Sequence, residues 1–129
     1  DMGFGNAAHK AWLPLTEAYR GLAVSAQDND PKSLLNFYRA LLKWRKQQTV
    51  LLHGDQALLP VHSQVMAFVR EHEGRQVLCA FNFSDSAASM DLPANFKLAT
   101  ALPVPGLSGG SVVGDCMTFE AYGALLLAL

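Results

Sequence analysis

The sequence predicts a mainly β protein in which an antiparallel β-sandwich follows a long loop and one α-helix. Two changes of pattern along the chain support this fold class. Residues 31–47 carry apolar side chains at helical spacing, whereas apolar residues after Gly54 alternate with polar ones in short runs bounded by Pro and Gly. Short strands at this spacing are typical of an antiparallel sandwich.

The composition is that of one ordinary folded domain. The chain has 129 residues, of which 50% are hydrophobic and 16% are charged, so it is too apolar to be intrinsically disordered. A chain of this length can bury a core without the help of disulfides or a metal. The formal net charge of −1 provides no positive field for nucleic acid or for an anionic membrane surface. We therefore expect neither as a partner.

Residues 1–30 show no sustained helical or strand period, and glycine and proline interrupt every short apolar run. This pattern predicts a long ordered loop, which is uncommon in a compact domain unless the loop is functional. We expect other parts of the protein to cover its large apolar side chains. These are Phe4, Trp12, Leu13, Leu15, Tyr19 and Leu22.

A helix is predicted over residues 31–47. The Asp30 carboxylate can accept from free amides of the first turn, and Pro31 loses nothing at the first helical position by lacking an N–H. The apolar residues occupy an arc wide enough to touch two neighbours. The remaining face is a narrow polar stripe, which we interpret as a solvated face rather than a phosphate site. The stripe consists of Lys32, Asn36, Arg39, Lys43 and Lys46.

The clearest strands are residues 65–71 and 76–83, which we expect to form a hairpin around a turn at 72–75. On the second of these strands Phe81 and Phe83 share a face with Cys79, and we expect that face to be the core. Further short strands are predicted at 57–61, 89–92, 97–102, 116–120 and 123–129.

One motif imitates an active site. Gly106, Ser108 and Gly110 spell the G-x-S-x-G pattern of a hydrolase nucleophile, which requires a preceding strand and a following helix. Prolines precede the motif, no stretch after it is long enough for a helix, and no histidine lies beyond His72. We therefore expect a flexible hairpin loop. No pair of carboxylates suited to acid/base catalysis emerges, so we expect no catalytic and no cofactor-binding residue in this chain.

The histidines His9, His53, His62 and His72 are scattered without a pair at i,i+4, so no metal site is predicted. The positions of Cys79 and Cys116 allow a disulfide, but buried free thiols are favoured. Asn82-Phe83-Ser84 is a glycosylation sequon, which we interpret as a strand end whose Asn and Ser satisfy the turn. No leader sequence opens the chain, which favours a cytoplasmic location, and a start at Asp1 is typical of a fragment.

Several separated pieces of the chain carry a family resemblance when they are taken in order. They are Met2-Gly3-Phe4, Ala11-Trp12-Leu13-Pro14-Leu15, residues 27–35, residues 38–46, Leu52-His53-Gly54-Asp55, residues 65–70, residues 77–84 and residues 119–124. In order and spacing, these pieces resemble the carboxyl-terminal end of the α-glucosidases of glycoside hydrolase family 13, the α-amylase superfamily. Trp44 departs from the Leu that is usual at its position in the last helix of that family.

The resemblance implies that residues 1–49 are the end of a catalytic (β/α)8 barrel and that residues 50–129 are its C-terminal antiparallel β-sandwich. Family members hydrolyse α-glucosidic bonds with retention, using carboxylates on barrel loops. None of those carboxylates can be carried onto a residue here. The chain is therefore expected to buttress the barrel of the same parent protein, to contact α-glucoside substrate little, and to be inactive and prone to self-association when isolated.

The alternative is a free-standing carbohydrate-binding β-sandwich. Such a module would present two or three exposed aromatic side chains in register on one sheet face. Strand alternation predicts that all the candidates are buried, which favours the buttress. They are Phe68, Phe81, Phe83, Phe96 and Phe119.

Overall fold

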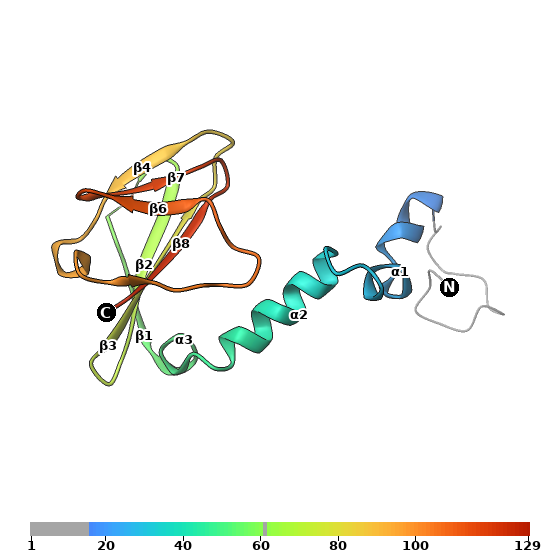
Figure 1. Ribbon diagram of the computed structural model, residues 1–129, viewed down its shortest axis with the longest axis horizontal. Helices are drawn as coiled ribbons and strands as arrows, with labels where there is room; N and C mark the ends of the chain where they lie inside the picture. Colours follow the sequence, from blue (N-terminus) through green and yellow to red (C-terminus); the bar gives the residue numbers. More distant parts are fainter. Residues whose placement is uncertain (1–15, 61) are drawn as a thin grey trace. The chain divides into compact units, whose positions relative to one another are not determined.

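The computed structural model describes residues 16–60 and 62–129 of the chain (Figure 1). It consists of two compact units, which divide between Leu42 and Lys43. The described residues of the first unit are mainly helical, and the strands that the structure describes lie in the second unit. None of the helices in the described ranges is long and apolar enough to cross a membrane.

The first unit contains a 3-10 helix η1 (Glu17–Leu22), a short helix α1 (Val24–Asp28) and most of α2 (Leu34–Arg45). The prediction of a continuous loop over residues 1–30 is therefore wrong for η1 and α1. Each is too short to display a helical period in the sequence. Residues 1–15, with Phe4, Trp12, Leu13 and Leu15, lie outside the described residues.

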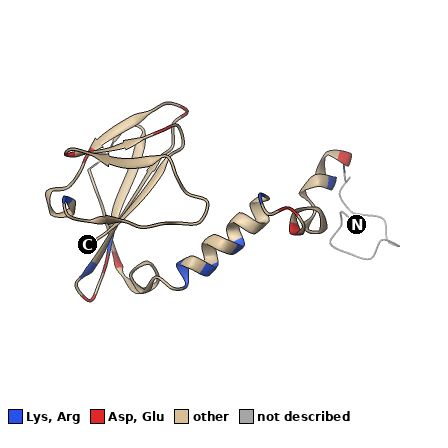
Figure 2. Ribbon diagram, in the orientation of Figure 1, with Lys and Arg blue, Asp and Glu red and all other residues tan. Residues whose placement is uncertain are grey.

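Helix α2 confirms the predicted helix, but it begins at Leu34 rather than at residue 31 and ends at Arg45. Ser33 caps it, because its Oγ accepts from the Asn36 amide at 3.2 Å. The Asp30 carboxylate instead accepts from the Lys32 amide at 2.9 Å and closes the turn before the helix. The predicted polar stripe is largely solvated, and Figure 2 shows basic residues spread along α2.

The second unit begins with the end of α2 and continues with α3 (Thr49–His53), a helix too short to be predicted from periodicity. Two antiparallel sheets follow (Figure 1). One sheet has the order β1-β2-β3-β8-β5 and the other has the order β4-β7-β6. The strands are β1 (Asp55–Leu58), β2 (Val65–His72), β3 (Arg75–Asn82), β4 (Ala88–Asp91), β5 (Thr100–Ala101), β6 (Gly110–Val113), β7 (Cys116–Phe119) and β8 (Ala124–Ala128). The predicted fold class is confirmed.

The β2–β3 hairpin forms as predicted, with pairing from Val65↔Asn82 to His72↔Arg75. Its turn places Glu73 and Gly74 at positive φ, the backbone geometry that tight hairpin turns require. The strand predicted at 97–102 is reduced to β5, because the 3-10 turn η2 (Ala94–Phe96) directs Phe96 into the core instead.

The core lies between the two sheets. It is formed by one face of β2, β3 and β8 together with residues of β4 and β7, and its largest fully buried side chains are Phe96, Leu78, Met117 and Leu127. On β3 this inner face is carried by Leu78 and Ala80. Cys79, Phe81 and Phe83 have the opposite parity and lie on the other side of the sheet. The expectation that this face is core is confirmed for Cys79 and Phe81, which belong to a second apolar cluster, and is wrong for Phe83, which is exposed.

Candidate functional site

The most informative surface is the outer face of the five-stranded sheet, which is the face turned away from the three-stranded sheet. Val77 and Cys79 of β3 and Leu126 of β8 are buried there in a second apolar cluster. Two segments cover them. Val50 and Leu51 of α3, with Trp44, pack over one part, while Leu102, Val104 and Leu107 from the connection between β5 and β6 pack against the cluster as well. Both faces of this sheet are therefore apolar.

Two arginines hold α3 in place, Arg45 from the end of α2 and Arg70 from strand β2 of the sheet. Arg45 Nη2 donates to the Leu51 carbonyl at 3.0 Å, and Arg70 Nη2 donates to the Gly54 carbonyl. Both contacts place positive charge at the carboxyl end of the helix, where it is favourable. Gly54 itself has no room for a side chain, because a Cβ would lie 2.5 Å from the Val50 carbonyl oxygen and 2.7 Å from that of Glu71. The junction between α3 and β1 is thus a fixed, packed connection.

Two polar side chains of this face, those of Arg70 and Cys79, are not activated for a reaction. Arg70 Nε is buried without a hydrogen-bond partner among the residues that the structure describes. Burial raises the pKa of the nearby Cys79 thiol to about 12, against the opposing charge of Arg70. A thiol that stays protonated at neutral pH is a poor nucleophile. Both cysteines are free, as favoured, although Cys116 is half-buried rather than buried.

Part of the outer face carries a row of aromatic rings. The ring centroids of Phe68 and Phe81 are 6.2 Å apart, and those of Phe81 and Phe83 are 6.5 Å apart. Phe83 is 67% exposed, so the expectation that all five candidate phenylalanines are buried is wrong for it. Phe96 and Phe119 are buried. Phe83 lies one residue beyond the end of β3, where strand alternation no longer predicts burial.

Two apolar neighbours extend this row across the sheet. Leu58 of β1 pairs with Phe68, and Met66 of β2 pairs with Phe81, so both lie on the same face as the rings. Leu58 is 70% exposed and Met66 is 44% exposed. We refer to Leu58, Met66, Phe68, Phe81 and Phe83 as the outer patch.

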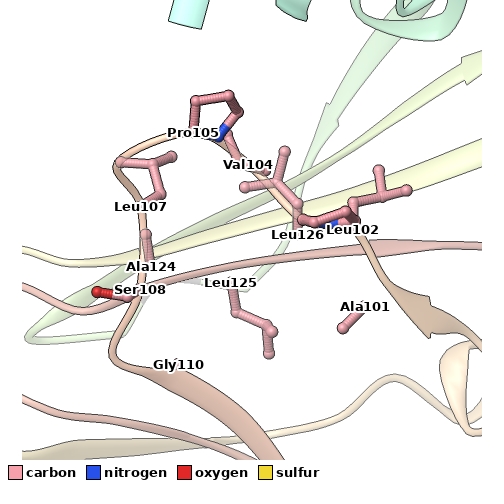
Figure 3. A pocket seen from close by; sticks show the side chains of 11 residues that line it. Ala101, Leu102, Val104, Pro105, Leu107, Ser108, Gly110, Ala124, Leu125 and Leu126 are labelled. Carbon is pink, nitrogen blue, oxygen red and sulfur yellow. The ribbon is translucent and has the colours of Figure 1, made fainter. Parts of the chain in front are cut away.

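The G-x-S-x-G motif lacks the strand-turn-helix context of a hydrolase nucleophile, because strand β6 and not a helix follows its serine. It borders an apolar cavity of about 470 Å³ between the segment 101–108 and β8 (Figure 3). In this described part of the chain, no histidine and no carboxylate lines the cavity beside Ser108. The motif is only partly the loop that the sequence predicts, because Gly110 begins strand β6 and pairs with Phe119.

The titratable residues do not converge. Within residues 16–60 and 62–129, no group of three or more His, Cys, Asp or Glu side chains is placed to hold a metal ion. The rings of His53 and His72 lie 5.8 Å apart, His62 Nδ1 accepts from two backbone amides, and His9 is outside the described residues. Every described carboxylate is exposed, and several lie at the turns of the sandwich (Figure 2).

Asn82 of the sequon is 3% exposed. Its Nδ2 donates to the carbonyls of Ser86 at 2.7 Å and Glu120 at 2.8 Å, while its Oδ1 accepts from the amide and hydroxyl of Ser84. The interpretation of the sequon as a strand end that satisfies its own turn is confirmed. The side chain also joins β3 to the corner that precedes β8.

Two family models match adjacent parts of the sequence. The model described as the catalytic domain of alpha amylase matches residues 1–54, and the model described as the C-terminal domain of maltogenic amylase matches residues 56–126. The two matches meet at the junction between α3 and β1. That junction is the packed connection described above.

Comparison with individual proteins indicates the same family. A probable alpha-glucosidase of Rhizobium meliloti is 37% identical over 93 residues, which is 72% of this chain and 16% of that protein. A probable oligo-1,6-glucosidase of Bacillus subtilis is 31% identical over 112 residues, which is 86% of this chain and 20% of that protein. The crystal structure of the alpha-glucosyl transfer enzyme XgtA superposes with a TM-score of 0.83 at 36% identity, covering 91% of this chain and 22% of that one. The chain thus spans about a fifth of the length of its relatives.

Proposed function

Since this chain belongs to the α-amylase family of glycoside hydrolases, we propose that it acts as the C-terminal part of an α-glucosidase-type enzyme and stabilises the catalytic barrel. We propose that the catalytic carboxylates belong to the barrel outside this chain. We propose the division expected from the sequence, with residues 1–49 completing the barrel and residues 50–129 forming the β-domain. We also propose a reducing, cytoplasmic location, which the free thiols of Cys79 and Cys116 support.

The observation that carries this proposal is the packed junction. The match to the catalytic domain extends to residue 54, whereas Val50 and Leu51, each 8% exposed, complete a cluster on the sheet and so belong to the β-domain of the proposed division. A flexibly tethered module would meet its neighbour through an exposed linker. A domain joined through shared core residues is expected to stabilise what precedes it.

The proposed parent reaction is retaining hydrolysis of an α-glucosidic bond. It requires one carboxylic acid to protonate the leaving oxygen and one carboxylate nucleophile, held about 5 Å apart in a site that substrate can enter. The described carboxylates of this chain are exposed, and several are engaged with basic partners, as Asp115 is with Lys97 at 2.7 Å. The catalytic pair is therefore assigned to the barrel outside this chain.

The test compares three proteins with an aryl α-glucoside as substrate: the isolated 129-residue chain, the full-length protein that contains it, and that protein without residues 50–129. We expect no turnover by the isolated chain above a heat-treated control and clear turnover by the full-length protein. Deletion of the β-domain is expected to cause aggregation or rapid thermal inactivation. Turnover by the isolated chain, or a deletion variant as stable as the full-length protein, would refute the proposal.

A second candidate function, carbohydrate binding, is favoured by one observation, the aromatic row that ends at the exposed ring of Phe83. Stacking on a sugar ring uses such a face, but sugar hydroxyls also need hydrogen-bond partners beside the ring. The side chains of the outer patch carry none. Calorimetric titration of the isolated chain with maltooligosaccharides separates the two functions, and we expect no heat of binding.

A further inference from the structure

We infer that His62 is a pH-sensitive switch at the entry to strand β2, closed while its imidazole is neutral and opened when the ring is protonated. The entry segment is residues 62–64, which lead directly into β2. The inference concerns the conformation of the sandwich and does not depend on the proposed function.

The first step of the argument is the position of the imidazole proton. The backbone amides of Gln64 and Val65 both donate to His62 Nδ1, at 3.1 Å each. A backbone N–H can only donate, so Nδ1 must be an acceptor and the proton of the neutral ring must lie on Nε2. The neutral side chain therefore holds two consecutive amides in place, as Asn and Asp side chains do in tight turns.

The second step is what these two amides fix. The Gln64 carbonyl accepts from the Phe83 amide at 2.9 Å. Its side-chain Nε2 donates to the hydroxyls of Ser84 and Ser86 at 3.0 Å each. Val65 is 3% exposed and belongs to the core between the sheets. The imidazole thus orients both the residue that joins the entry segment to the end of β3 and the first core residue of β2.

The third step is the effect of a second proton on the ring. An imidazolium carries an N–H on both nitrogens and accepts no hydrogen bond. Protonation of His62 would direct a further N–H at the amides of Gln64 and Val65, which would lose their acceptor in a half-buried environment. An unpaired buried donor costs more than the hydrogen bond contributes when it is made. The charged ring must therefore leave this position, and the entry segment opens.

The fourth step concerns the charges around the ring. His62 lines two cavities, of about 560 Å³ and 310 Å³. Among the described residues that line them, the only charged one is Asp91 of β4, while β2 contributes Val65, Met66 and Ala67 and the segment after β3 contributes Phe83. The one histidine ion pair in the described parts of the chain is that of His72 with Glu73 at 4.0 Å. No paired carboxylate therefore holds the charged form of His62 in place.

The two hydrogen bonds of His62 are expected to be present at neutral pH and lost in mild acid. Histidine in an unfolded chain takes up its proton at about pH 6.5. The folded domain accepts that proton on His62 only when the two hydrogen bonds break. The stability that they contribute is therefore complete above this pH and is lost as the pH falls. Acid is expected to loosen the entry segment and also Leu59, which packs against the core between the sheets.

The experiment measures amide hydrogen exchange of residues 62–69 in the full-length protein at about pH 7.5 and about pH 5.5, on either side of the ordinary histidine pKa. Relative to an unstructured peptide at the same pH, the protection of wild type should fall at least about fivefold in acid. His62→Asn should change by less than about twofold, because the Asn Oδ1 can accept from the same amides and does not titrate. His62→Ala should be as weakly protected at both pH values as wild type is in acid. His53→Asn is the matched control at an exposed histidine and should keep the fall seen in wild type.

Three results would overturn the inference. The first is equal protection of wild type at the two pH values. The second is a fall that persists in His62→Asn, because another titrating group would then be responsible. The third is a fall of the same size in β7, because the whole sandwich would then be losing stability. If His62→Ala does not fold, the comparison of wild type with His62→Asn still decides the question.

Discussion

Different interactions stabilise the two regions of the described chain, residues 17–42 and residues 43–129. Among the described residues before Lys43, the only buried side chain is that of Ser33, and Leu22, Leu34 and Tyr38 are each more than half exposed. Hydrogen bonds organise this region, because Gln27 accepts from the Ser33 hydroxyl at 2.7 Å and from the Asn36 amide at 3.0 Å. Residues 43–129, in contrast, enclose two apolar clusters.

This difference in stabilising interactions predicts which region can fold by itself. Each intramolecular hydrogen bond contributes only about 0.5–1.5 kcal/mol net, and helices of this length are marginal in water without packing. Burial of apolar surface supplies most folding free energy. The sandwich is therefore expected to be autonomous, whereas residues 17–42 are expected to depend on apolar cover from the rest of the enzyme.

The largest effect is expected when an aromatic ring is removed from the core of the sandwich. Phe96→Ala should destabilise the sandwich by about 3–5 kcal/mol in urea unfolding, because Phe96 is 1% exposed between the sheets. Phe83→Ala is the control, and in the isolated chain it should cost less than about 1 kcal/mol since that ring is 67% exposed there. A Phe96→Ala effect as small as that of the control would show that the sandwich does not depend on burial.

A pH series tests the second apolar cluster. Because burial raises the pKa of Cys79 to about 12, the unfolded chain loses this proton at lower pH than the folded chain. The thiol's contribution is therefore complete below about pH 9 and is lost as the pH rises toward 12. Between about pH 8 and pH 11, wild type should lose roughly 3 kcal/mol more stability than Cys79→Ala in urea unfolding. Parallel losses in the two proteins would contradict the burial of this thiol.

A smaller effect is expected from the buried amide. Asn82→Ala should destabilise the sandwich by about 2–3 kcal/mol, because the carbonyls of Ser86 and Glu120 lose their donor inside the protein. Asn95→Ala is a matched control at an exposed amide that donates to Gln76 at 3.2 Å, and it should be nearly neutral. Chemical denaturation of both variants decides between a structural role for Asn82 and a dispensable one.

The smallest loss of stability is expected from a substitution in residues 17–42, and it should be confined to that region. Ser33→Ala removes the cap of α2 and should cost its helix about 1 kcal/mol. We expect faster amide exchange over Leu34–Arg45 without a change in the unfolding midpoint of the sandwich. Ser25→Ala in the exposed helix α1 is the control. A loss of sandwich stability on Ser33→Ala would mean that the two regions unfold together.

Much of the fold follows from local patterns. The β2–β3 hairpin is predictable because alternation and a Gly-containing turn agree over its whole length. Strand β6 is not, because Gly109 and Gly110 precede two consecutive valines and only its pairing with β7 makes the segment extended. The sequence predicts the start of α2 too early, because Asp30-Pro31 is a strong local signal for a helix start. In the structure Ser33 is the cap, because its hydroxyl accepts from the Asn36 amide while the Asp30 carboxylate accepts from the Lys32 amide.

The outer patch shows how far the sequence alone can predict the candidate site. Strand parity correctly places Phe81 and Phe83 on one face with Cys79, but parity does not distinguish a sheet's two faces when both are apolar. Which face meets the second sheet depends on the connections through η2 and β5. Those are tertiary features, and sequence period carries no information about them.

The buried side chain of Asn82 has a consequence for production of this protein in a secretory, glycosylating host. Oligosaccharide transfer would replace one hydrogen on Nδ2, which donates to both Ser86 and Glu120 in the folded domain. It would also attach a bulky hydrophilic group to an atom inside the protein. Glycosylation of the nascent chain and folding of the sandwich are therefore mutually exclusive, and each modified molecule is expected to be retained by quality control or degraded.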